Sequence, residues 1–237
     1  MPGLSTPKDP IVPSYYGLRM VVGWIGVLLP FVLSLGHFII FKPLALQPSI
    51  SDYYYTFMRN IFEGSLCTIG VFLAATYGYD RTDAIAGRIA GLAAIGVAWF
   101  PCKNPCTPAW VSHAHVFFAS SLLLTLAFFC LHQFPQSDLP PHRRTVKKGQ
   151  RNKLYYLFGW TFIACIVLSF LCRWDWSGNP FQWYRGLFWF ESIAVVSFGI
   201  AWLIKSESFL RDEGAPPKPF FIRHKPDAQP ILSAPIR

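Results

Sequence analysis

The stretch MVVGWIGVLLPFVLSLGHFIIF, residues 20–41, decides the fold because its 22 residues include no Asp, Glu, Lys or Arg. A second run without these charged residues covers the 34 residues of 104–137. Both runs exceed the roughly 20 apolar residues that a helix needs to cross a bilayer. A cleavable signal peptide has an apolar core of only about 7–15 residues. Residues 20–41 are therefore interpreted as a retained transmembrane helix.

The composition of the whole chain agrees with a polytopic membrane protein. Of its 237 residues, 53% are hydrophobic and 14% are charged, whereas a soluble domain has roughly 25% charged residues. An ordinary soluble enzyme is thereby excluded. The apolar pattern predicts an all-α fold with six transmembrane helices, each about as long as a crossing requires. The predicted spans are 20–41, 57–78, 84–100, 112–133, 154–172 and 186–204.

The formal charge of +9 predicts how these spans are oriented. Of the 21 Lys and Arg residues, 16 fall on the side of the two termini and 5 on the opposite side. By the positive-inside rule, both termini and the loop 134–153 are expected to be cytoplasmic. The positive charge then needs no nucleic-acid partner. If the source is bacterial, the expected location is the plasma (inner) membrane.

Proline-rich tails flank the predicted membrane domain. Residues 1–18 and 207–237 contain many prolines, which lack the backbone donor that helices and strands use. We therefore predict an irregular cytoplasmic tail at each end and a six-helix domain over residues 19–206.

Two cysteines lie in the predicted outer loop PCKNPCTP, residues 101–108. Thiols can oxidise on the outer side of the membrane, so a disulfide between Cys102 and Cys106 is the favoured prediction. Free thiols are the alternative. Metal binding by this pair is a weaker third interpretation, because a second Cys or His pair at zinc spacing is missing.

Polar residues in and beside the spans collect at their predicted outer ends. An ionisable group within the hydrocarbon costs on the order of 2–3 kcal/mol, so it normally faces the bundle interior and has a partner. Several helices that place such groups at a similar depth predict one shared polar pocket, open to the outer side. The predicted members of this pocket are Ser51, Asp52, Arg59, Glu63, His115 and Glu191.

Some of these residues also have a purely structural interpretation. Arg59 and Glu63 are four residues apart, so an ion pair within one helix would explain both of them. His113 and His115 are two residues apart and point to different sides of a helix, so at most one of them faces the pocket. Glu191 is the hardest to explain in this way, because its neighbours in the sequence are apolar.

Three short motifs resemble those of a known family. QPSISDYYYT, residues 47–56, resembles the Pro-x-Ile-Ser-Asp signature in the first outer loop of a six-helix membrane family. That family includes the damage-regulated autophagy modulators and the GPI-anchor-remodelling proteins of the Golgi. HVFFA, residues 115–119, and ESIAVVSFG, residues 191–199, resemble the beginnings of its fourth and sixth helices. The resemblance extends over roughly residues 23–206, and the chain is also similar to uncharacterised bacterial membrane proteins.

The resemblance implies a role in lipid remodelling, lipid asymmetry or membrane signalling. It also implies that four polar positions are shared with the family, namely Ser51, Asp52, His115 and Glu191. The chain departs from the family pattern after Asp52, where Tyr54, Tyr55 and Thr56 replace a Gly followed by Pro-Glu.

Two classes of function follow from these observations. The first is a lipid-binding or lipid-regulatory protein whose pocket takes a membrane lipid, and it is slightly favoured because no catalytic motif is complete. The alternative is a zinc-dependent intramembrane hydrolase or acyl-remodelling enzyme that acts on a lipid ester or amide. A transporter fits less well, since no internal repeat is apparent. The candidate zinc ligands are His37, Asp52, His115 and Glu191.

Overall fold

The computed structural model describes most of the predicted membrane domain and a short piece of each tail. The described residues are 11–13, 15–40, 46–75, 81–137, 144–173, 185–207, 209–212 and 221–223. Within them the chain forms six α-helices, in agreement with the predicted all-α class. The helices are α1 (Tyr15–Ile40), α2 (Arg59–Ala75), α3 (Arg81–Trp99), α4 (Ala109–Phe128), α5 (Val146–Arg173) and α6 (Gly186–Lys205).

Shorter elements lie between and beyond these helices. A 3-10 helix, η1 (Ser51–Tyr55), precedes α2, and α4 continues into a π-helical turn at Phe129–Gln133. The strand β1 (Ile11–Pro13) pairs antiparallel with β2 (Phe221–Arg223), with Ile11 opposite Arg223. The predicted irregular tails therefore contain one short strand each.

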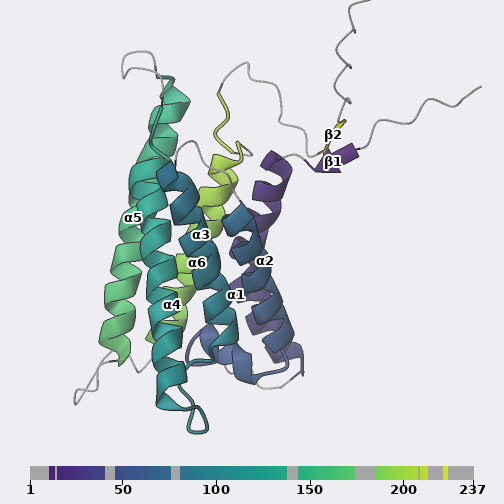
Figure 1. The fold of residues 1–237 in the computed structure, drawn as a ribbon, viewed down its shortest axis with the longest axis vertical. Helices are drawn as coiled ribbons and strands as arrows, with labels where there is room; N and C mark the ends of the chain where they lie inside the picture. Colours follow the sequence, from purple (N-terminus) through teal and green to yellow (C-terminus); the bar gives the residue numbers. More distant parts are fainter. Residues whose placement is uncertain are drawn as a thin grey trace, which may run out of the picture.

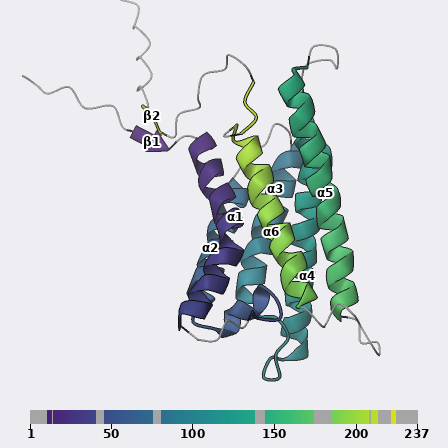
Figure 2. The ribbon, with the colours of Figure 1, turned by 180° about the vertical axis from the view of Figure 1, so that it is seen from behind.

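The helices alternate in direction and form a closed ring. Each helix packs against the next one in the sequence, and α6 packs against α1 (Figures 1 and 2). The two strands and the beginning of α5 lie at one end of the bundle. The helix η1 and the turn between α3 and α4 lie at the opposite end (Figure 1).

Glycines allow the closest approach between helices in this ring. A Cβ atom built on Gly91 of α3 would lie 2.5 Å from the backbone oxygen of Gly70 on α2. A Cβ atom on Gly199 of α6 would lie 2.5 Å from the backbone oxygen of Gly23 on α1. Small residues of this kind hold helices together in membranes, where van der Waals contact replaces the hydrophobic effect.

Four of the described helical segments are long and apolar enough to cross a membrane, which indicates an integral membrane protein. These segments are Tyr16–Ile40, Ala109–Gln133, Val146–Arg173 and Gly186–Lys205. The helices α2 and α3 are shorter or less apolar, with 17 and 19 residues. They nevertheless turn large apolar side chains outward, including Val71 and Leu92, which is 65% exposed.

The helix α5 begins eight residues before the predicted span of 154–172. Thr145 caps this polar extension, because its Oγ1 accepts a hydrogen bond from the backbone N–H of Lys148 over 3.1 Å. Lys148 Nζ in turn donates to the backbone oxygens of Phe134 and Gln136, at 3.0 Å each. The cap and these contacts stabilise the first part of α5, which hydropathy alone assigned to a loop.

Candidate functional site

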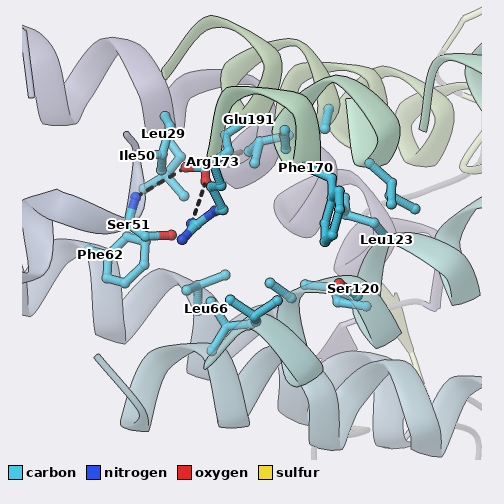
Figure 3. Close-up of a pocket in the computed structure, with 18 residues that line it drawn as sticks. Leu29, Ile50, Ser51, Phe62, Leu66, Ser120, Leu123, Phe170, Arg173 and Glu191 are labelled. Carbon is cyan, nitrogen blue, oxygen red and sulfur yellow. Dashed lines mark hydrogen bonds and ion pairs between the residues drawn. The ribbon is translucent and has the colours of Figure 1, made fainter. Parts of the chain in front are cut away.

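A cavity of about 140 Å³ lies inside the ring of helices, toward the end that carries η1 (Figure 3). Its walls are mainly apolar and come from all six helices. They include Leu29, Phe62, Leu66, Leu123, Phe170 and Val195. Three polar residues, Ser51, Arg173 and Glu191, gather at one end of the cavity. The cavity therefore combines an apolar chamber with a charged end.

Ser51 is buried and connects two helices at this end. Its backbone N–H donates to Oε2 of Glu191 on α6 over 3.3 Å. Its hydroxyl oxygen lies 3.2 Å from Nε2 of His115 on α4. Because Ser51 is the first residue of η1, these two contacts also fix the position of the 3-10 helix between α4 and α6.

His115 is almost fully buried, with 2% of its surface exposed. Its Nδ1 lies 2.7 Å from the backbone oxygen of Phe100. A carbonyl oxygen can only accept, so Nδ1 carries a proton and donates it. In the neutral ring, Nε2 then accepts a hydrogen bond from the Ser51 hydroxyl. His113 is exposed, so of these two histidines only His115 is buried.

Glu191 faces Arg173, which sequence reasoning counted only as an outer charge. Oε1 of Glu191 lies 3.9 Å from a terminal guanidinium nitrogen of Arg173, at the carboxyl end of α5 (Figure 3). Arg173 was missed as a site residue, although its place directly after an apolar span put it at the same depth as Glu191. The pair supplies both signs of charge beside the cavity.

Asp52 is not part of the cavity lining and instead contacts the neighbouring segments of the chain. Its backbone N–H donates to Oγ of Ser49 over 3.1 Å, and its Oδ2 accepts from the same hydroxyl over 2.8 Å. Its Oδ1 accepts from the thiol of Cys102 over 3.2 Å. Burial, and then the charge of Asp52, raise the pKa of the Cys102 thiol well above its ordinary value.

The disulfide predicted between Cys102 and Cys106 is not formed in the structure. Both residues are free thiols. Cys102 is buried against Asp52, whereas Cys106 is exposed on the same loop. The thiol of Cys102 is therefore directed into the protein rather than toward its predicted partner.

Arg59 and Glu63 form a separate cluster outside the cavity lining. Nε of Arg59 lies 2.6 Å from Oε1 of Glu63, one helical turn along α2. A terminal guanidinium nitrogen of Arg59 also donates to the hydroxyl of Tyr54 over 2.6 Å. The ion pair within one helix thus accounts for both charged residues.

The four candidate zinc ligands do not meet in one place. Nε2 of His37 accepts from the amide of Gln47 over 3.1 Å, in a surface hollow apart from the cavity. Asp52 is engaged by Ser49 and Cys102, while His115 contacts the hydroxyl of Ser51 and Glu191 contacts its backbone N–H. Over the part of the chain that the structure describes, no three His, Cys, Asp or Glu side chains are grouped to hold a metal ion.

The fold and the site together define a helical membrane protein with an internal cavity that is charged at one end. Comparisons with protein-family models, with curated proteins and with solved structures found no match.

Proposed function

We propose that this chain is a six-span membrane protein, with both termini cytoplasmic, that binds a membrane lipid in its outward-facing cavity. In this proposal the acyl chain occupies the apolar part of the cavity. The headgroup region meets Ser51, Arg173 and Glu191. The main observation in support of the proposal is that one cavity contains both an apolar chamber and a charged pair.

The lengths and surfaces of α2 and α3 support six crossings rather than four. At 1.5 Å per residue, α2 is about 25 Å long and α3 about 28 Å long, close to the roughly 30 Å hydrocarbon core. Both helices lie alongside the four strongly apolar ones in the ring.

The size of the cavity suits part of an acyl chain. An apolar protein cavity of about 150 Å³ can hold one benzene molecule, so about 140 Å³ accommodates a few methylene groups. Phe170 lines the cavity and is also 58% exposed. An acyl chain could therefore enter the cavity sideways from the bilayer, past the phenyl ring of Phe170.

The charged end suits the oxygen atoms of a lipid headgroup. The side chain of Arg173 is 33% exposed, and its 3.9 Å separation from Glu191 is longer than a hydrogen bond. A guanidinium has five N–H donors and binds phosphate or carboxylate oxygens well. Arg173 is therefore the residue that we expect to contact ester or phosphate oxygens.

Two substitutions on α4 test the proposal. Ala119 lines the cavity, so Ala119→Trp should fill it, whereas Leu124 is exposed on the outer surface, so Leu124→Trp should leave it open. Native mass spectrometry of the protein in mild detergent should detect co-purified lipid in the wild type and in Leu124→Trp. The lipid should be lost in Ala119→Trp. Equal lipid retention by both variants would contradict binding in the cavity.

The zinc-dependent alternative receives no comparable support, because its four candidate ligands are dispersed over separate contacts. Ester chemistry at the same cavity can instead be examined through Ser51 and His115.

A further inference from the structure

Ser51 and His115 have the arrangement of a nucleophile and its general base. We propose that Ser51 attacks the ester carbonyl of a lipid held in the cavity and that His115 accepts the serine proton. This inference rests on the proposed lipid binding and adds a reaction to it. The reaction is ester hydrolysis through an acyl-serine intermediate, and it uses no metal ion.

The contacts around His115 prepare it for this role. The backbone oxygen of Phe100 accepts the proton of Nδ1 over 2.7 Å, which leaves the lone pair of Nε2 directed at the Ser51 hydroxyl, 3.2 Å away. A base that is oriented by a third group and lies within about 2.6–3.2 Å of a hydroxyl is the usual signature of an activated serine. Here a backbone oxygen takes the orienting role that a carboxylate has in many hydrolases.

The position of Ser51 is equally well determined. The contact from its backbone N–H to Glu191 fixes the main chain at the first residue of η1. Its side chain reaches the end of the apolar chamber, since Ser51 lines the cavity together with Phe62 and Leu66 (Figure 3). An acyl chain in that chamber would therefore bring its own ester group to the serine.

Arg173 supplies positive charge at the point where negative charge would develop. Figure 3 shows its guanidinium joined to Glu191 by a dashed line and close to the side chain of Ser51, at the polar end of the cavity. The carbonyl oxygen of an ester becomes an oxyanion when a nucleophile adds to the carbon. Fixed donors aimed at such an oxygen typically contribute a rate factor of about 10²–10³.

Each step of the reaction is balanced with water as the only co-reactant. The Ser51 oxygen bonds to the carbonyl carbon while its proton passes to Nε2 of His115. The bond from carbon to the alcohol oxygen then breaks, and His115 returns the proton to the leaving alcohol. Water attacks the acyl-serine, His115 takes its proton, and the fatty acid leaves as Ser51 regains a proton.

A long-chain alkyl fluorophosphonate is a direct probe of this serine. Attack by an activated serine on phosphorus forms an O–P bond, releases fluoride and leaves a stable adduct. We expect mass spectrometry of the wild-type protein in detergent to find the adduct on Ser51. Ser51→Ala should abolish it, and His115→Asn should slow it by at least about 100-fold, the usual contribution of a general base.

A matched control separates activation from mere access to the cavity. Ser120 lines the same cavity from α4, so the reagent reaches it too, and in the wild-type protein Ser120 should stay unlabelled while Ser51 reacts. A second measurement follows the pH dependence of the labelling. The labelling rate of the wild type should rise with pH and then reach a plateau, because His115 acts as a base only after it has lost its extra proton.

The outcomes distinguish this inference from the proposed function. Absence of the adduct on Ser51 in wild-type protein that retains lipid would overturn the serine chemistry and leave lipid binding intact. A labelling rate that rises without a plateau would overturn the role of His115. Adduct formation on Ser51 in protein that never co-purifies lipid would instead contradict the proposed function.

Discussion

The thiol of Cys102 donates a hydrogen bond to Oδ1 of Asp52 over 3.2 Å, between the turn that follows α3 and the helix η1, 50 residues apart in the sequence. The hydroxyl of Tyr55 strengthens the same connection, because it donates to the backbone oxygen of Cys102 over 2.8 Å. Asp52 directly follows Ser51. The position of the candidate nucleophile therefore depends on a reduced Cys102 and on the loop that carries it.

This contact predicts different reactivities for the two cysteines of that loop. In folded protein without reductant, a maleimide should modify the exposed Cys106 rapidly and leave Cys102 unmodified until the protein is denatured. Cys102 is protected because it is buried and because its raised pKa keeps it in the unreactive thiol form. Peptide mass spectrometry gives the extent of modification at each site. Recovery of a Cys102–Cys106 disulfide peptide would contradict the free thiols.

The raised pKa of Cys102 also predicts a loss of stability at high pH. A group whose pKa is higher in the folded state stabilises the fold below its unfolded pKa, about 8.5 for a thiol, and this contribution declines as the pH rises further. The melting temperature should therefore fall as the pH rises from about 8 to about 10, because the thiol of the unfolded chain loses its proton over roughly this range. Cys102→Ser keeps a hydroxyl donor for Asp52 and does not ionise, so its melting temperature should fall less. Equal falls in both proteins would exclude the thiol as the cause.

Glu191 is predicted to stabilise the site through Ser51. Glu191→Ala removes the acceptor of the Ser51 N–H, and an unsatisfied buried donor costs about 1–3 kcal/mol of unfolding free energy. Glu191→Gln retains an acceptor oxygen and should lose less. Glu63→Ala is the matched control, because it removes an exposed ion pair within one helix, worth about 0.3–0.5 kcal/mol. Thermal unfolding in detergent ranks the three variants, and a smaller loss in Glu191→Ala than in Glu63→Ala would contradict this role.

The sequence predicted the helices best where apolarity alone defines them. The predicted span 186–204 corresponds to α6 at Gly186–Lys205, and 20–41 lies largely within α1 at Tyr15–Ile40. The beginning of α5 was missed because Thr145 and Lys148 stabilise it through a cap and tertiary hydrogen bonds. Hydropathy does not report such contacts.

The sequence predicted how deep the site residues lie in the membrane, but not which side of its helix each of them occupies. The position of a residue along a span gives its depth in the membrane, and on this basis Ser51, His115 and Glu191 were expected in one region. Depth does not say which side of a helix a residue occupies. For that reason Arg59 and Glu63 were expected in the pocket, whereas they lie outside the cavity lining. Contacts between segments far apart in the sequence, such as that of Cys102 with Asp52, depend on the folded arrangement and have no local sequence signal.

The contact between Gly70 and Gly91 predicts a clear difference in thermal stability between two glycine substitutions. A Cβ atom on Gly91 would meet the backbone oxygen of Gly70 at 2.5 Å, so Gly91→Ala must push α2 and α3 apart. Such overpacking typically costs about 1–3 kcal/mol. Gly64→Ala on the outer face of α2 meets no atom within 4 Å and should be neutral or slightly stabilising. Thermal unfolding should show the difference, and equal stabilities would contradict the close approach.

The last prediction concerns the orientation of the whole bundle. Gln150, near the beginning of α5, and Lys103, in the turn between α3 and α4, are both exposed and lie at opposite ends of the structure. With 16 of 21 Lys and Arg residues on the side of Gln150, that end should be cytoplasmic. In a Cys106→Ser background, a membrane-impermeant maleimide should label Lys103→Cys in intact cells. It should label Gln150→Cys only after the cells are permeabilised. The reverse pattern would place the charged end of the cavity on the cytoplasmic side, and its lipid would then come from the inner leaflet.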